Sequence, residues 1–335
     1  MKTFIEKLPK AELHVHLEGT LEPELLFELA QRNDVELPYA TPAEVVAAYD
    51  FYDLPSFLAI YYKAMEVLRT ADDFYDLSMA YFEKAAAQNV IYVEPFFDPQ
   101  AHTVRGVAFD TVIEGIHAAQ LEAADKLGVQ SNLIMCFLRD LDAHSAAQHL
   151  AMAESHLDWL VGVGLDSDEC DNPPRKFADV FKDARAMGLK LTMHCDVNQQ
   201  DIVGHMWECL DLIEVDRIDH GVNALDDPRL VEAIKERDIG LTVCPISNRF
   251  VVQNLTGDEI RQFLQHGIKA TINSDDPAYF QGYMNENLLA LADDAGFSAA
   301  ELGELTRNAF DICWADAQIK ANLMARLDAY LAQSG

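Results

Sequence analysis

Eight short apolar segments alternate with longer amphipathic segments in this chain of 335 residues, and the alternation predicts an α/β fold, a (β/α)8 barrel of the TIM type. Two further observations favour a closed barrel. Half of the residues are hydrophobic, which is enough for a large core, and polar residues gather where the apolar segments end. Because no internal repeat and no flexible linker interrupts the sequence, we expect one barrel domain over residues 1–335.

The strand-length apolar segments are Ala11–His16, Val90–Phe97, Asn132–Leu138, Trp159–Leu165, Leu189–Cys195, Arg217–Gly221, Gly240–Cys244 and Lys269–Asn273. Helical patterns lie between most of them, for example in Thr111–Leu127, Lys176–Met187, Asp226–Arg237 and Asp258–His266. Leu21–Gln88 is too long for a simple crossover and is rich in aromatic residues, so we expect a helical insert over the barrel mouth after strand 1. Ala299–Leu331 predicts two or three C-terminal helices that pack around the barrel.

The formal net charge of −31 would repel nucleic-acid phosphates and anionic membrane surfaces, so we expect neither partner and favour a small neutral or cationic substrate. The six cysteines are scattered without C-x-x-C pairs, which indicates reduced thiols. The N-terminus has no apolar stretch as long as that of a signal peptide, and no later apolar stretch is long enough to span a membrane. We therefore expect a cytoplasmic protein. The oligomeric state stays open, with a homo-oligomer as one alternative.

Polar residues follow the predicted strands at their C-terminal ends, where a barrel builds its substrate site. Read in order, these strand ends supply His14, His16, Glu94, Asp98, Arg139, Asp166, Asp168, His194, His220, Cys244, Asn248, Asp275 and Asp276. Histidines and carboxylates should therefore converge on one face of the barrel.

His14 and His16 lie two residues apart on a strand, so their side chains point the same way, as two ligands of one ion require. The pair alone is equally well explained by buried histidines bonded to carbonyls. His194 and Asp275 end two other strands, and three imidazoles with one carboxylate fill all but the open position of a catalytic zinc site. We therefore predict His14, His16, His194 and Asp275 as the ligands of one divalent cation, zinc.

His220 ends the sixth predicted strand in Arg217-Ile-Asp-His-Gly. Its expected role is catalytic: it would lie beside the metal-bound water and orient it or stabilise charge during attack. A fourth imidazole ligand and a hydrogen-bonded core histidine are the alternatives.

Six motifs follow one another along nearly the whole chain: Glu12-Leu-His-Val-His-Leu-Glu-Gly19, Gly162-Val-Gly-Leu-Asp-Ser-Asp-Glu169, Leu191-Thr-Met-His194, Asp219-His-Gly221, Cys244-Pro-Ile-Ser-Asn248 and Asn273-Ser-Asp-Asp-Pro277. In this order, they resemble the motifs of the adenosine/adenine deaminase family of the metal-dependent amidohydrolase superfamily. The resemblance implies a hydrolytic purine deaminase with one zinc ion per chain. The zinc would lower the pKa of its water to about 7, and the resulting hydroxide would attack the purine carbon that bears the exocyclic nitrogen.

The resemblance also implies roles for single residues. His220 and Asp275 would handle the proton of the hydroxide, and Asp276 would accept a hydrogen bond from a ring nitrogen. The backbone from Gly164 to Ser167, which includes Asp166, would line the other ring edge.

Three features are more similar to the adenine branch of the family than to its nucleoside branch. They are Glu18, where adenosine enzymes usually carry Asp, the Asp219-His220 pair, and the run Val93–Gln100. A longer acidic residue at position 18 would crowd the region that a ribose occupies. We therefore expect adenine, or a related aminopurine base, as the substrate.

One position departs from the family pattern His-Ala-Gly-Glu, in which the Glu protonates the ring nitrogen of the substrate. Here that position is Val197. Asp196 could supply the proton if burial raises its pKa, and we predict it as the catalytic acid, although it could equally cap the helix that begins near Gln199. Otherwise Gln199 donates a hydrogen bond only, or the substrate is an N6-substituted adenine or an adenosine-like nucleoside.

Two other classes of function compete with the deaminase prediction. The departure at Val197 would also suit a catalytically impaired homologue that binds purines without converting them. A binuclear amide or ester hydrolase usually adds a bridging Lys or Glu after strand four, and Leu165-Asp166 offers no such Lys. The unrelated zinc deaminases with a P-C-x-x-C motif are excluded, because the sequence has none.

Overall fold

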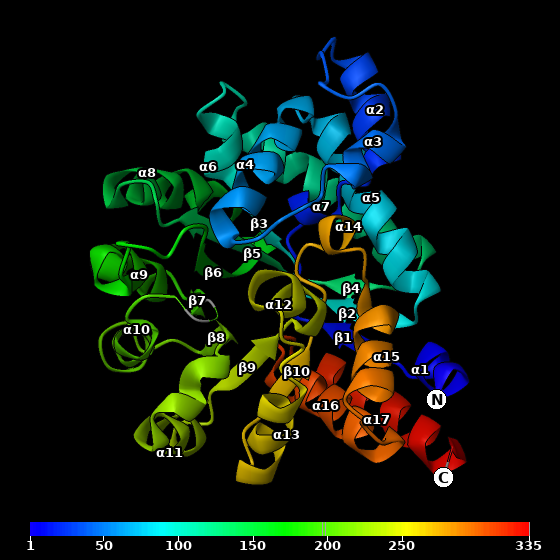
Figure 1. Ribbon diagram of the computed structural model, residues 1–335. Helices are drawn as coiled ribbons and strands as arrows, with labels where there is room; N and C mark the ends of the chain where they lie inside the picture. The colour runs from blue at the N-terminus through cyan, green and yellow to red at the C-terminus, as the bar shows by residue number, and fades with distance from the viewer. Residues whose placement is uncertain (196, 198, 335) are drawn as a thin grey trace.

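The computed structural model describes residues 1–195, 197 and 199–334. Its strands are β1 Lys10–Glu12, β2 Val90–Val93, β3 Phe96–Phe97, β4 Gln130–Ser131, β5 Leu133–Leu138, β6 Leu160–Asp166, β7 Lys190–Cys195, β8 Arg217–His220, β9 Gly240–Val243 and β10 Ala270–Ile272. They form a ring of parallel strands surrounded by helices, which confirms the predicted α/β barrel (Figure 1).

The barrel closes where the first and last strands meet. The strands pair in the orders β1-β2-β4 and β10-β9-β8-β7-β6-β5-β3, and β2 and β3 are the two halves of the predicted strand Val90–Phe97. Beyond the ends of β1 and β10, Val15 pairs in parallel with Asp275. The Asp275 N–H donates to the His14 carbonyl at 3.1 Å, and the His16 N–H donates to the Asp275 carbonyl at 3.0 Å. Closure therefore brings residues 14–16 beside residue 275.

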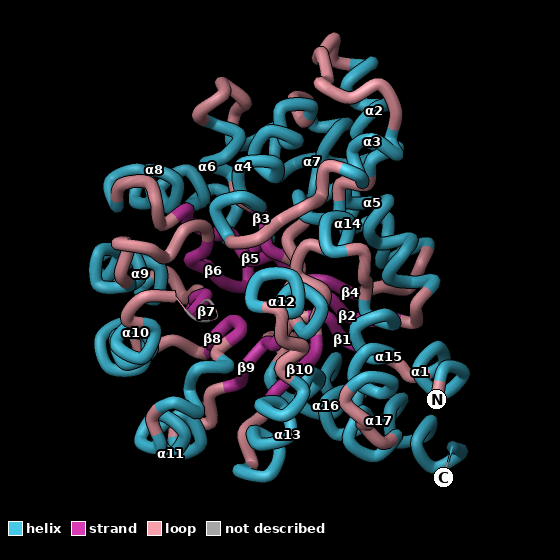
Figure 2. Tube along the Cα trace, in the orientation of Figure 1, coloured by secondary structure: helices cyan, strands magenta, loops and turns pink. Residues whose placement is uncertain are grey.

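Helices form the outer layer of the molecule (Figure 2). They are α1 Lys2–Lys7, α2 Pro23–Arg32, α3 Pro42–Ala47, α4 Leu54–Ala64, α5 Ala71–Ala87, α6 Pro99–Thr103, α7 Phe109–Lys126, α8 Ala143–Ala153, α9 Ala178–Ala186, α10 Ile202–Glu208, α11 Pro228–Glu236, α12 Pro245–Val252, α13 Gly257–His266, α14 Pro277–Phe280, α15 Met284–Asp294, α16 Ala299–Ile312 and α17 Ala317–Ser334. Several begin at side-chain caps; Thr70 and Asp73, for example, form a reciprocal capping box at the start of α5.

Two predicted departures from the strict alternation of strands and helices are confirmed. Helices α2 to α5 form the insert between β1 and β2, and α16 and α17 form the C-terminal helices. The two ends of the chain lie side by side, because the Tyr330 hydroxyl donates to the Phe4 carbonyl at 2.7 Å (Figure 1). Within the described ranges, no helix combines the length and the apolar character that crossing a membrane requires.

The barrel interior contains a buried ion pair as well as apolar side chains. Nη1 of Arg217 lies 2.6 Å from Oε2 of Glu94, and neither side chain is exposed. The ring of Trp314 covers the guanidinium at 4.1 Å. Glu94, which the sequence puts near a strand end, thus has a charged partner inside the barrel.

Candidate active site

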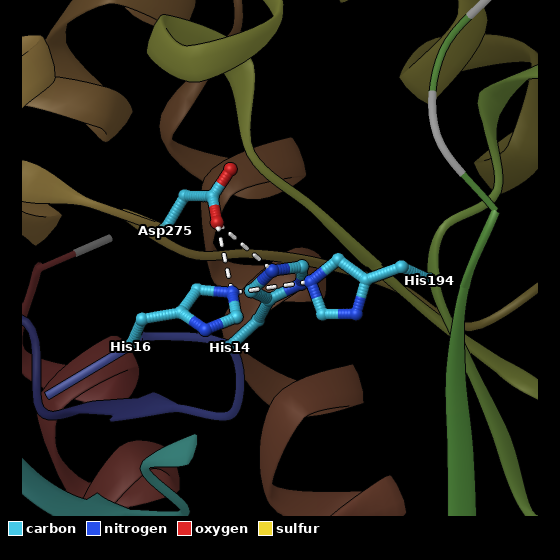
Figure 3. Close-up of side chains that lie close together, drawn as sticks. All are labelled: His14, His16, His194 and Asp275. Carbon is cyan, nitrogen blue, oxygen red and sulfur yellow. Dashed lines mark hydrogen bonds and ion pairs between the residues drawn. The ribbon is translucent and has the colours of Figure 1, made fainter. Parts of the chain in front are cut away.

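Three histidines and one aspartate that are far apart in the sequence converge at the C-terminal end of the barrel (Figure 3). His14 and His16 follow β1, His194 lies in β7, and Asp275 follows β10. One ligand atom from each residue lies within 4.8 Å of the others, and none of the four residues is more than 6% exposed. The structure therefore brings together all four residues that the sequence predicts as metal ligands.

The spacing of the donor atoms fits a metal ion. Nε2 of His14 and Nε2 of His16 lie 3.1 Å and 3.4 Å from Oδ1 of Asp275, and Nε2 of His16 lies 3.1 Å from Nε2 of His194. Donors that surround a zinc ion tetrahedrally at 2.0–2.1 Å lie about 3.3 Å apart. These atoms turn toward one another (Figure 3), so the geometry and the chemistry of the set fit zinc.

Metal binding needs a carboxylate and neutral imidazoles, and the electrostatics of the cluster favour these forms at Asp275 and His194. Burial opposes ionisation of Asp275, but the neighbouring His14 and hydrogen bonds from His14 and His16 hold its pKa well below the usual range. Burial, together with His14 and His16, also holds the pKa of His194 well below its ordinary value. Burial opposes protonation of His16, but the charge of Asp276 and the hydrogen bond to Asp275 raise the pKa of His16 well above its ordinary value, so this imidazole must lose a proton when a metal ion binds.

Three residues of the site have unusual backbone conformations. Asp275 has φ +66°, His220 has φ +58° and Ser167 has φ +73°, all in the left-handed region that non-glycine residues seldom adopt. Such strain persists where surrounding contacts fix it, and it is common at functional sites. At Gly19, an added Cβ would lie 2.1 Å from Oδ1 of Asp276, so glycine permits the close approach of these two segments.

His220 lies next to the four-residue cluster, at the end of β8. Its Nε2 is 3.7 Å from Oδ2 of Asp275. Burial lowers the pKa of His220 to about 4, against the opposing effect of Asp275, so the ring is neutral near pH 7. His220, Cys244 and Asp275 also form a second grouping of potential ligands, which shares Asp275 with the first.

A cavity opens onto the cluster. His16, His194, His220 and Asp275 form its metal wall. The facing wall comes from the insert helix α4 and from α12, α14 and the turn after β7. Its residues are Leu54, Phe57, Leu58, Tyr61, Tyr62, Val197, Gln199, Ser247, Asn248, Val251 and Phe280. The mixture of apolar and polar groups suits a small organic ligand.

Three of the predicted substrate-binding residues, Asp166, Ser167 and Asp276, line this cavity. Burial and the adjacent Asp275 raise the pKa of Asp276 well above its usual value. Burial also raises the pKa of Asp166 to about 6, although His16 opposes this shift. Both carboxyl groups can therefore carry a proton near neutral pH, and so donate as well as accept hydrogen bonds.

The other two predicted substrate-binding residues, Glu18 and Gly164, are not among the described residues that line the cavity. Oε1 of Glu18 accepts hydrogen bonds from the Asp98 N–H at 3.0 Å and from Nε2 of His102 at 2.9 Å. Gly164 lies within β6, where an added Cβ would be 2.4 Å from Sγ of Cys136. Glu18 thus holds the backbone of a residue that does face the cavity.

Asp98, Tyr61 and Tyr62 also line the cavity, although the sequence analysis assigned no role to any of them. Oδ1 of Asp98 and the Tyr61 hydroxyl are buried and make no hydrogen bond within the described ranges. The Tyr62 hydroxyl donates to Oγ of Ser167 at 2.7 Å. Asp98 is one of the strand-end residues that the sequence indicates, but that signal alone gave it no specific role. The tyrosines lie on a helix of the insert and carry no such signal.

The predicted proton donor Asp196 lies outside the described residues. Its neighbour Val197, which stands where the resemblance calls for Glu, lines the cavity and is 6% exposed. Gln199 also lines the cavity. The departure from the family pattern therefore falls at the cavity itself.

Comparisons with known proteins agree with this geometry. The family model described as adenosine deaminase matches residues 9–330. The chain is 47% identical to an adenine deaminase of Marinomonas sp. (strain MWYL1), over 99% of this chain and all of that protein. The crystal structure of an adenine deaminase from Arthrobacter aurescens matches with a TM-score of 0.93 and 40% identity, covering 97% of this chain and 99% of that one. The crystal structure of an amidohydrolase from Burkholderia ambifaria with bound Zn matches with a TM-score of 0.89 and 28% identity, covering 99% of this chain and 94% of that one.

Proposed function

The chain belongs to the adenosine deaminase family, and from that membership we propose that it hydrolyses adenine to hypoxanthine and ammonia. The observation that carries the proposal is the buried cluster of three histidines and one aspartate, which opens onto a cavity lined by both apolar and polar side chains. The full-length similarity to adenine deaminases supports the choice of the free base as substrate.

In this proposal His14, His16, His194 and Asp275 hold one zinc ion per chain. A zinc ion held there would act as a Lewis acid and would lower the pKa of a bound water to about 7. In the hydrolysis, a water oxygen adds to the purine carbon that bears the amino group, the bond from this carbon to the exocyclic nitrogen breaks, and the nitrogen leaves as ammonia.

The residues around the cluster position the base and move protons. Neutral His220, 3.7 Å from Asp275, accepts the proton of the attacking water and passes it toward the leaving nitrogen. Asp276 hydrogen-bonds a ring nitrogen, and Asp166 and Ser167 contact the other ring edge. Glu18 acts behind them, through its bond to the Asp98 N–H.

Protonation of the ring nitrogen needs an acid, because attack otherwise leaves negative charge on the ring. Val197 cannot supply a proton, and Gln199 can donate a hydrogen bond but cannot transfer a proton. We assign this step to Asp196, the carboxylic acid that follows His194 and Cys195 in the sequence.

N6-substituted adenines are a second candidate substrate class. One observation favours them: apolar side chains, among them Leu54, Leu58, Val197 and Val251, line the wall that faces the cluster. Such a wall could receive an alkyl group on the exocyclic nitrogen, which would then leave as an amine instead of ammonia.

A substrate panel with zinc-loaded protein tests the proposal. Adenine, adenosine and N6-alkyl adenines are supplied separately, and ammonia or amine release is measured together with formation of the oxo-purine. We expect turnover of adenine and much weaker turnover of adenosine. Tight purine binding without product would contradict the proposal and indicate a purine-binding protein, and two metal ions per chain would favour a binuclear hydrolase.

A further inference from the structure

We propose that Asp219 is a positioning residue of the metal centre: its single carboxylate fixes the orientation and the tautomer of two ligand imidazoles, those of His194 and His14. Asp219 lies in β8, next to β7 on one side and β9 on the other, and its side chain is fully buried. It is not one of the four proposed ligands, and it is not among the described residues that line the cavity.

The link to His194 is direct. The two residues are paired across β7 and β8, and Oδ2 of Asp219 faces Nδ1 of His194 at 3.5 Å. This Nδ1 is buried and has no hydrogen bond to any other described residue. A carboxylate has only acceptors, so it favours the tautomer in which Nδ1 carries the hydrogen. Nε2 of His194 then offers its lone pair to the cluster.

The link to His14 runs through Thr242, which is paired with Asp219 across β8 and β9. The Thr242 hydroxyl donates its one hydrogen to Oδ1 of Asp219 at 2.8 Å. Its oxygen lies 2.9 Å from Nδ1 of His14 and, with its hydrogen already used, can only accept from that atom. Nδ1 of His14 therefore carries the hydrogen too, and Nε2 again faces the cluster.

The two imidazoles differ in the number of acceptors that face Nδ1. The Thr242 carbonyl also lies 3.2 Å from Nδ1 of His14, so this imidazole keeps an acceptor when the hydroxyl is removed. Within the described ranges, Nδ1 of His194 has no second acceptor besides Asp219. Loss of Asp219 should therefore affect His194 more strongly than His14.

Zinc affinity of the whole protein tests the proposal, measured by competition with a chelator of known affinity. Asp219→Asn keeps the size of the side chain but replaces one acceptor oxygen with a donor. Because outer partners of ligand histidines typically contribute 10- to 100-fold to metal affinity, we expect a loss of about that size. This readout needs no purine, so its failure is distinguishable from failure of the proposed deaminase activity.

The hydroxyls on either side of Asp219 provide a matched control. The Thr192 hydroxyl donates to Oδ2 at 2.7 Å and, within the described residues, has no hydrogen bond to a ligand histidine, whereas Thr242 links the carboxylate to His14. Thr192→Val should leave zinc affinity unchanged. Thr242→Val should lower it, by less than Asp219→Asn, because the backbone carbonyl remains as an acceptor.

Nitrogen-15 NMR of the imidazoles in metal-free wild-type protein provides a second test that needs no variant to fold. We expect Nδ1–H tautomers for His194 and His14. Unprotonated Nδ1 in neutral His194 would overturn the proposal, and so would wild-type zinc affinity in a folded Asp219→Asn protein.

Discussion

The two walls of the cavity differ in origin and in the interactions that hold them. The metal wall comes from strand ends of the barrel, and polar contacts such as the 3.1 Å contact of His14 with Asp275 join its side chains. The facing wall comes largely from the insert helix α4, where aromatic rings pack on one another, as Phe57 and Tyr61 do at 5.1 Å between centroids. The strand ends of the barrel thus supply the proposed metal ligands, whereas the insert helix α4 helps to determine the shape of the cavity. Substitutions in the two walls should therefore change different quantities.

The largest effect is expected on the metal wall, from His194→Ala. This change removes a proposed ligand, so zinc affinity should fall by more than the 10- to 100-fold expected for an outer partner, and turnover should fall to background. Metal content after dialysis and ammonia release are the measurements. A variant that retained both zinc and turnover would exclude His194 from the centre.

His220→Asn should separate catalysis from metal binding on the same wall. Because general acid–base steps contribute about 10²–10⁴-fold, turnover should fall by that range while zinc content stays at the wild-type level. If zinc is lost in parallel with activity, His220 is a ligand and the proposed proton-transfer role is wrong.

Asp196→Asn tests the residue chosen from sequence alone. With no acid to protonate the ring nitrogen, turnover should fall by at least about 10²-fold, with little change in zinc content. Steady-state kinetics and metal analysis on one preparation give both values. Unchanged turnover would eliminate Asp196 as the proton donor.

The smallest effect is expected on the facing wall, from Tyr62→Phe. The change removes one hydrogen bond, to Oγ of Ser167, and neutral hydrogen bonds contribute about 0.5–1.5 kcal/mol. KM should rise by no more than about tenfold, with kcat and zinc affinity unchanged. Tyr52→Phe, an exposed tyrosine of the same insert, is the matched control. A large loss of kcat in Tyr62→Phe would contradict the separation of the two walls.

The metal wall could be predicted because each of its residues ends an apolar segment, and a closed barrel brings the C-terminal ends of its strands together. The same logic predicted the strands themselves. The predicted strand Val90–Phe97 is divided into β2 and β3, with Pro95, which has no N–H for the hydrogen-bond ladder, between them.

The facing wall could not be predicted in detail. Which face of α4 meets the cavity depends on how the insert packs, and helical periodicity alone does not select Tyr61 and Tyr62. The sequence also did not predict how far each residue of a strand lies from the strand end that faces the cavity. Gly164 precedes the end of β6 by two residues and is not among the described residues that line the cavity, so its place at the ring edge stays a prediction.

X-ray absorption spectroscopy of the zinc-loaded protein tests the central claim most directly, because two overlapping ligand sets compete for Asp275. We predict one zinc ion per chain with three imidazole nitrogens and a carboxylate oxygen at 2.0–2.2 Å, and no sulfur. A sulfur ligand at about 2.3 Å would indicate the grouping of His220, Cys244 and Asp275, and would contradict the proposed centre.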